Sequence, residues 1–277
     1  MIIDSHVHVF PDKICKKTIR KLANNDPNHI LPYYNDGSVN GAREKMKEWG
    51  IDLGIIAPIA TNEKQQDNVI NFALNIQKNN PEFITLGTVY PDALDVLDRL
   101  DYMKSEGVHG IKLHPDYQNF FIDEEKMFPI YERCQKLELP ILFHSGYDPV
   151  SPDCIHAAPE GIIKVARAFP DLIIVAAHTG GLAYSSCSRD CFKELDNLCF
   201  DTAIASVTFT SDEYRKIIDI YGIERFIFGT DNPWGNGIDD FKFFEKVGLT
   251  SEEKEYLFEK NACRIFKIKE REIKNEI

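Results

Sequence analysis

Short apolar runs alternate with longer amphipathic segments along the whole chain. The short runs are rich in β-branched and aromatic residues, which is typical of buried parallel strands. We expect strands at residues 2–9, 52–57, 83–88, 110–114, 140–144, 172–178, 198–202 and 225–230. The longer segments carry apolar residues at helical spacing. We expect helices at residues 39–49, 64–79, 93–105, 124–137, 160–169, 189–195, 212–221 and 251–266.

The alternation of eight strands with eight helices predicts an α/β fold in which crossovers join parallel strands. With 277 residues, the chain has the length of a closed (β/α)8 TIM barrel, for which about 250 residues is typical. A doubly wound open sheet is the alternative, but no G-x-G-x-x-G turn follows the first strand. No internal repeat, low-complexity linker or change of composition marks a boundary. We therefore expect a single domain over residues 1–277.

Two connecting segments, at residues 10–37 and 145–159, are longer than a minimal barrel needs. Each comes directly after an expected strand. Both should therefore lie over the mouth of the barrel, where the active sites of such folds form and where long loops shape the substrate pocket.

Histidines gather at the carboxyl ends of the expected strands. Five of the eight in the chain occupy such positions, namely His6, His8, His114, His144 and His178. Because side chains alternate along a strand with a period of two, Asp4, His6 and His8 should share one face. Two imidazoles two residues apart can converge on one cation, and neutral imidazole is a good ligand of zinc and other first-row metals. The first strand therefore predicts two histidine ligands of a metal site.

Charged side chains also lie at the carboxyl ends of the expected strands. The eighth strand ends in Asp231, and a carboxylate is costly to bury without a partner. Its position in a histidine-rich barrel predicts a metal ligand or a proton acceptor. On the fourth strand, Lys112 and His114 share a face by the period of two, so both should line the same pocket.

Composition and net charge limit the classes of molecule that the protein is expected to bind. The 32 basic and 44 acidic side chains give a formal net charge of −12. Acidic groups spread along the chain repel phosphate backbones and anionic headgroups, so we expect neither nucleic acid nor a membrane as partner. Seven cysteines without framework spacing are typical of free thiols in a reducing compartment. These features predict a cytoplasmic protein that acts on a small molecule, with a homodimer as the default oligomeric state.

Five elements occur in a fixed order: Asp4-Ser-His6-Val-His8, Gly110-Ile-Lys-Leu-His114-Pro, the strand-end His144, His178-Thr-Gly-Gly and Gly229-Thr-Asp231-Asn-Pro-Trp234. Together they resemble the amidohydrolase superfamily. The nearest likeness is to its amidohydrolase-related branch (amidohydrolase 2), which includes aminocarboxymuconate semialdehyde decarboxylase-like and resorcylate decarboxylase-like enzymes. The resemblance covers residues 1 to about 234.

The resemblance implies a single divalent metal ion, with zinc the first candidate, and the ligands His6, His8, His144 and Asp231. It implies that His178 stays off the metal and orients or deprotonates the bound water or the substrate. Lys112 matches a position where some members of the superfamily carry a carbamylated lysine that bridges two metals, so a binuclear site is the alternative. We favour Lys112 as a substrate-binding ammonium, with His114 beside it as a second substrate-binding residue.

The function implied is that of a metal-dependent hydrolase. A zinc-activated water would attack an amide, ester or lactone bond of a small carboxylated or cyclic substrate, with Asp231 and His178 as the catalytic residues. The first alternative is a non-oxidative, metal-dependent decarboxylase of an aromatic or unsaturated carboxylic acid, which the same residues would serve. The second is a catalytically inactive metal-binding barrel, although such a protein would be expected to lack at least one of the five elements.

Overall fold

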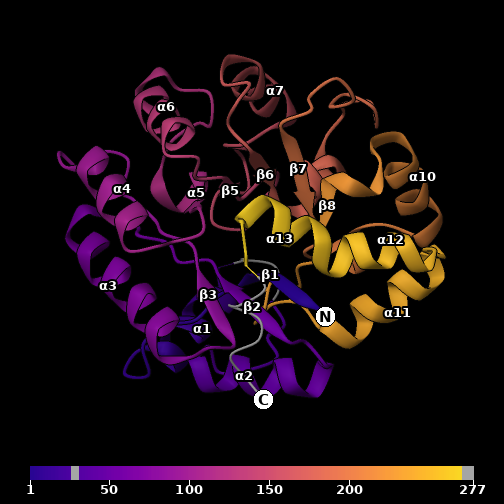
Figure 1. Ribbon diagram of the computed structural model, residues 1–277, viewed down its shortest axis with the longest axis horizontal. Helices are drawn as coiled ribbons and strands as arrows, with labels where there is room; N and C mark the ends of the chain where they lie inside the picture. Colours follow the sequence, from indigo (N-terminus) through magenta and orange to yellow (C-terminus); the bar gives the residue numbers. More distant parts are fainter. Residues whose placement is uncertain (26–30, 270–277) are drawn as a thin grey trace.

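Eight short parallel strands form a ring in the computed structural model, which describes residues 1–25 and 31–269 (Figure 1). The strands are β1 (Ile3–Val7), β2 (Leu53–Ile56), β3 (Phe83–Thr85), β4 (Ile111–Leu113), β5 (Ile141–Phe143), β6 (Ile174–Ala176), β7 (Leu198–Asp201) and β8 (Phe226–Ile227). Each lies inside a predicted strand, so all eight strand predictions are confirmed.

The ring is closed by hydrogen bonds at two places. Regular pairing joins β1, β2 and β3 in one group and β4 to β8 in a second group. Between the groups, the backbone nitrogen of Gly87 donates to the carbonyl oxygen of Gly110 at 2.8 Å. On the other side, the nitrogen of Ser5 donates to the carbonyl of Phe228, also at 2.8 Å. The fold is therefore the predicted (β/α)8 TIM barrel.

Helices lie around the outside of the ring (Figure 1). They are α1 (Cys15–Ala23), α2 (Val39–Trp49), α3 (Glu63–Asn79), α4 (Val96–Ser105), α5 (Pro115–Gln118), α6 (Phe128–Lys136), α7 (Pro159–Ala168), α8 (Ala177–Gly180), α9 (Ala205–Thr208), α10 (Ser211–Tyr221), α11 (Gly237–Val247), α12 (Ser251–Glu255) and α13 (Asn261–Phe266). Single turns of 3-10 helix occupy Glu125–Met127, Leu182–Tyr184 and Ile223–Arg225, and a π-helical turn at Tyr256–Lys260 joins α12 to α13. Within the described residues, no helix is long and apolar enough to cross a membrane.

Local signals at the ends explain where the helices begin and stop. The Ser38 hydroxyl accepts the backbone N–H of Gly41 at the start of α2, and Gly50 ends that helix in the left-handed conformation, with φ of 73°. At the start of α10, Thr210 and Glu213 bond to each other's backbone in a reciprocal cap. Seven of the eight predicted helices are present, and α1, α11 and the four-residue helices α5, α8 and α9 are additions that were not predicted.

The predicted helix at 189–195 is wrong. The structure has successive turns there, in which Cys191 donates to the carbonyl of Ser188 and Lys193 to that of Asp190, each three residues back. Phe192 is buried in the core and anchors the segment without a helix. A helix of this length is marginal by itself, so the tertiary packing around Phe192 decides the backbone.

A register shift in β1 separates two side chains that were predicted to share a face. The pairing of β1 with β2 is irregular between Asp4 and Val7. Ile3 packs inside the barrel, whereas Val7 packs in the layer between strands and helices. The Asp4 carboxylate is therefore not directed with the His6 and His8 rings: it accepts the backbone N–H of His6 at 3.1 Å and the backbone N–H and hydroxyl of Thr230 at 2.9 and 2.6 Å. The prediction that Asp4 joins the two histidines is wrong because the bulge reverses the alternation.

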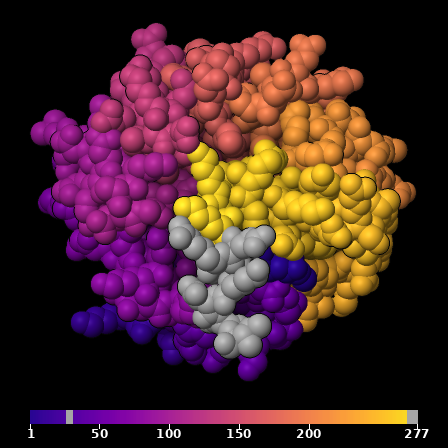
Figure 2. Space-filling model, viewed as in Figure 1, coloured from indigo at the N-terminus to yellow at the C-terminus, as the bar shows by residue number. Residues whose placement is uncertain are grey.

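The end of the barrel where the strands begin is closed by α13. Ile265 and Phe266 are buried against inward-facing residues of the strands, among them Ile3 and Leu142. Figures 1 and 2 show this C-terminal helix, in yellow, lying across the middle of the ring. The opposite end, where the strands finish, is the one that carries the histidines.

Candidate metal centre

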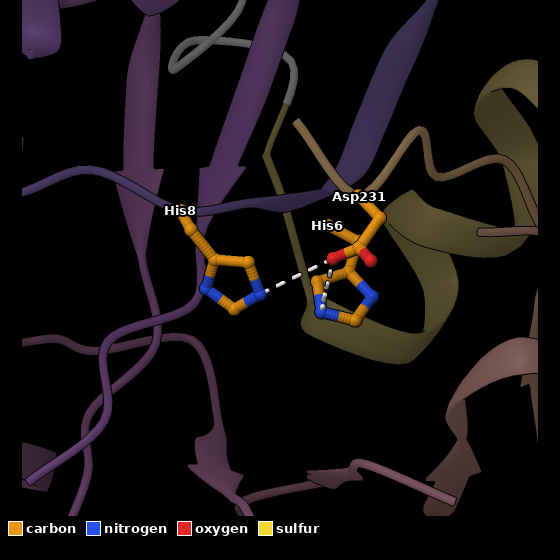
Figure 3. Close-up of side chains that lie close together, drawn as sticks. All are labelled: His6, His8 and Asp231. Atoms are coloured by element: carbon orange, nitrogen blue, oxygen red, sulfur yellow. Dashed lines mark ion pairs between the residues drawn. The ribbon is translucent and has the colours of Figure 1, made fainter. Parts of the chain in front are cut away.

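His6, His8 and Asp231 converge at the carboxyl ends of β1 and β8 (Figure 3). The Oδ1 atom of Asp231 lies 3.3 Å from Nε2 of His8 and 3.5 Å from Nε2 of His6. His6 is buried, and the other two side chains retain only slight exposure, at 11% for His8 and 13% for Asp231. The structure thus brings together three of the four predicted ligands.

The hydrogen bonds behind the two rings fix which nitrogen atoms carry a proton. Nδ1 of His8 lies 2.9 Å from the carbonyl oxygen of Ala57, which can only accept, so this nitrogen is the donor. Nδ1 of His6 donates to Oδ2 of Asp201 at 2.7 Å. Both Nε2 atoms are then left with lone pairs that face the carboxylate of Asp231. Two imidazole lone pairs and a carboxylate that face one another repel unless a cation lies near them, so these residues fit a divalent metal ion.

Electrostatics keep Asp231 ionised. Burial raises its pKa, but in their protonated forms His6 and His8 outweigh burial and lower the pKa of Asp231 to about 2. Lys112 is fully buried, with Nζ 3.0 Å from Nε2 of His6, and burial lowers the pKa of this lysine to about 8. The site therefore places a carboxylate and a buried ammonium group, whose pKa remains above neutral pH, beside one imidazole.

A second group of ligand atoms lies at the ends of β4 and β5. The rings of His114 and His144 are stacked in parallel, with centroids 4.1 Å apart and planes inclined by 7°. Oδ2 of Asp148 lies 3.4 Å from Nε2 of His114 and 3.7 Å from Nε2 of His144. Burial lowers the pKa of both histidines well below the usual value. The predicted ligand His144 thus stands with this group and with His178, apart from the other three.

His178 follows β6 and joins the two groups. Its ring stacks with that of His6 at a centroid distance of 5.5 Å, and its Nε2 lies 3.1 Å from Nδ1 of His144. The backbone has a left-handed φ of 55° at His178, and its N–H donates to Oδ1 of Asp201 at 2.8 Å. A non-glycine residue in that conformation carries strain of about 1–3 kcal/mol, which is typical of functional sites.

Comparison of the sequence with models of known families assigns the chain to a family. A family model described as amidohydrolase matches residues 3–268. The chain belongs to the amidohydrolase family. A comparison with curated proteins found no similar sequence.

Solved structures support the fold of this amidohydrolase. The 5-carboxyvanillate decarboxylase of Sphingomonas paucimobilis has a TM-score of 0.73 at 15% identity, over 97% of this chain and 99% of the other. The 4-oxalomesaconate hydratase of Rhodopseudomonas palustris has a TM-score of 0.67 at 20% identity, over 96% of each chain. A candidate 2-pyrone-4,6-dicarboxylic acid hydrolase of Pseudomonas putida has a TM-score of 0.65 at 18% identity, over 96% and 97%.

Sequence reasoning missed three acidic residues that the structure places beside the predicted histidines. Asp201 ends β7, and the rule that selected Asp231 at the end of the eighth strand would have found it. Asp148 lies in the long segment 145–159, four residues after His144, and that spacing was the available signal. Asp116, two residues after His114, has a side chain with no exposed surface, and only the tertiary structure reveals that burial.

Proposed function

We propose that this amidohydrolase is a metal-dependent hydrolase that cleaves an amide, ester or lactone bond of a small carboxylated or cyclic substrate. The ion, with zinc as the first candidate, would be held by His6, His8 and Asp231. The observation that carries the proposal is that two imidazole lone pairs and an ionised carboxylate converge on one point. When bound there, a divalent ion would supply a Lewis acid that acidifies water and polarises a carbonyl oxygen.

The protein groups have separate tasks in this proposal. Asp231, whose low pKa keeps it ionised at neutral pH, takes the proton from the attacking water. His178 lies over His6 and delivers a proton toward the leaving group. Lys112 is the buried cation of the site and binds a substrate carboxylate, with His114 as the second substrate-binding residue. His144 holds His178 in place through the contact of its Nδ1 with Nε2 of that ring.

Decarboxylation of an aromatic or unsaturated acid is the second candidate. The observation that favours it is Lys112, a buried amine beside the metal ligands that would anchor the carboxylate to be lost. Among the solved structures, the 5-carboxyvanillate decarboxylase of Sphingomonas paucimobilis catalyses a reaction of this kind, as its name states.

Two measurements test the proposed function. Purified protein is incubated with carboxylated lactones, amides, esters and aromatic acids, and hydrolysis products and carbon dioxide are assayed separately. We expect hydrolysis that stops on removal of the metal with a chelator and returns with zinc. Carbon dioxide without hydrolysis would establish the second candidate instead.

Asp231→Asn tests the role of the carboxylate. The variant should keep its fold by circular dichroism and lose about 100-fold or more of turnover, because the amide cannot accept the proton of water. Asp239→Asn, which changes an exposed aspartate of α11, is the matched control and should turn over like the wild type. A fully active Asp231→Asn protein would remove Asp231 from its assigned role.

A further inference from the structure

We propose that Asn35, near the end of the long segment that follows β1, is a positioning residue for two of the proposed metal ligands, His8 and Asp231. It acts on them through Asn232. The inference rests on the proposed function, because the two ligands are assigned there. Asn35 is not itself a ligand, and its effect is to fix the geometry in which the ligands meet the ion.

Asn232 connects the two ligands. It directly follows Asp231 in the chain, and its backbone carbonyl oxygen accepts the N–H of His8 at 2.6 Å. Its own backbone N–H donates to the Thr230 hydroxyl at 3.1 Å. A displacement of Asn232 therefore moves both ligands relative to each other.

The backbone of Asp231 depends on support from its neighbours. Its φ is 61°, in the left-handed region that non-glycine residues adopt infrequently. Such a conformation persists where the surrounding structure fixes it. Trp234 contributes by donating its N–H to the carbonyl oxygen of Asp231 at 2.7 Å. Asn232 forms the adjoining peptide, so whatever holds Asn232 in place also holds this conformation.

The segment before α2 makes the contact that fixes the Asn232 side chain. Nδ2 of Asn35 donates to Oδ1 of Asn232 at 2.6 Å, and the N–H of Tyr34 donates to the carbonyl oxygen of Pro233 at 2.8 Å. Asn232 has no exposed surface, and its Nδ2 has no hydrogen-bond partner among the described residues. Removal of the Asn35 amide would leave a buried oxygen without its donor, which favours a displaced Asn232.

Asn35 is itself held in a tight turn. Its Oδ1 accepts the N–H of Gly37 at 2.8 Å. Gly37 has a φ of 75°, and a Cβ atom there would lie 2.5 Å from Cγ1 of Ile19, so the turn requires glycine. The carbonyl oxygen of Gly37 accepts the N–H of Phe10 at 2.8 Å. The donor amide is therefore preorganised and tied to the chain two residues after His8.

The zinc affinity of the folded protein tests the proposal. Full-length protein stripped of metal is titrated with Zn²⁺ in competition with a chromogenic chelator, and urea denaturation of the metal-free protein is measured in parallel. We expect Asn35→Ala to weaken zinc binding about 10-fold or more, as is usual for residues that orient ligands. Asn40→Ala, at an exposed side chain of α2 that bonds to Glu44, is the matched control and should bind zinc like the wild type.

A double-mutant cycle tests the path through Asn232. Asn232→Ala removes the acceptor but keeps the backbone bonds to His8 and Thr230. If Asn35 acts through Asn232, the double variant should lose no more zinc affinity than the weaker-binding single variant. Additive losses would overturn the proposal. If Asn35→Ala does not fold by circular dichroism, Asn35→Ser takes its place with the same expected loss.

The remaining outcomes separate this proposal from the proposed function. A wild-type protein that binds no zinc would overturn both. A wild type that binds zinc, together with unchanged affinity in Asn35→Ala, would overturn only the role of Asn35. Lower stability of Asn35→Ala in urea without a loss of zinc affinity would likewise assign Asn35 a purely structural role.

Discussion

Asp201 is the single residue that organises most of the candidate active site. Its Oδ2 receives the Nδ1 hydrogen of His6, and its Oδ1 receives the backbone N–H groups of His178 and Ala203 at 2.8 and 3.1 Å. Burial raises the pKa of this carboxyl group, so its charge depends on these donors. One carboxylate thus fixes the tautomer of a metal ligand and the strained backbone of a neighbouring histidine.

We predict that Asp201→Asn weakens metal binding by about 10–100-fold, the range usual for loss of a residue that orients a ligand. The amide is a poorer acceptor for the His6 ring, so the lone pair on Nε2 is less firmly directed at the metal. Competition with a chromogenic chelator measures the affinity. Asp196→Asn, an exposed aspartate just before β7, is the control. An unchanged affinity in Asp201→Asn would show that His6 is oriented by other contacts.

Helix α13 closes one end of the barrel, and the candidate active site lies at the other end. Phe266 is 1% exposed and packs with inward-facing strand residues. His109, just before β4, also lies beside this helix, with Nδ1 2.9 Å from the carbonyl oxygen of Phe266. The helix therefore contributes to stability at the end of the barrel opposite the predicted ligands.

Phe266→Ala should lower the free energy of unfolding by about 3–5 kcal/mol, because it removes a buried ring and leaves a cavity. Urea denaturation measures the loss, and metal content of the folded variant should stay at the wild-type value. Leu94→Ala, at a side chain that is 100% exposed, should change stability by less than about 0.5 kcal/mol. Equal stabilities for the two variants would contradict the role assigned to α13.

The stability of the whole molecule should depend on pH through Asp240 of α11. This side chain is 2% exposed; its Oδ1 accepts the Ser206 hydroxyl at 2.6 Å, and its Oδ2 has no partner among the described residues. Burial raises its pKa to about 8. A carboxyl group whose pKa is higher in the folded state stabilises the fold fully below its unfolded pKa, and that contribution is lost as the pH rises toward 8.

Asp240→Asn removes this titration. We expect the free energy of unfolding of the variant, relative to that of the wild type, to rise between pH 5 and pH 8. Urea denaturation of both chelator-treated proteins at each pH gives the difference, in which the titrating groups that are not coupled to Asp240 cancel. Asp212→Asn, which changes an exposed aspartate of α10, should show no such trend. A difference that is the same at both pH values would assign the pH dependence to other groups.

Much of the architecture follows from the sequence because it depends on local periodicity. Apolar runs and helical spacing placed all eight strands and seven helices, and the positions of His6, His8 and Asp231 at strand ends predicted that they converge. These signals are local, since every parallel strand of a barrel ends at the same mouth.

The tertiary structure alone decided the rest. A register shift in β1 separated the Asp4 side chain from the His6 ring, and packing around Phe192 replaced a predicted helix with turns. Long-range contacts brought Asp148 to His114 and divided the predicted ligands between two groups. A bulge, a loop conformation and the partner of an imidazole nitrogen depend on residues far apart in the chain, so no local pattern contains them.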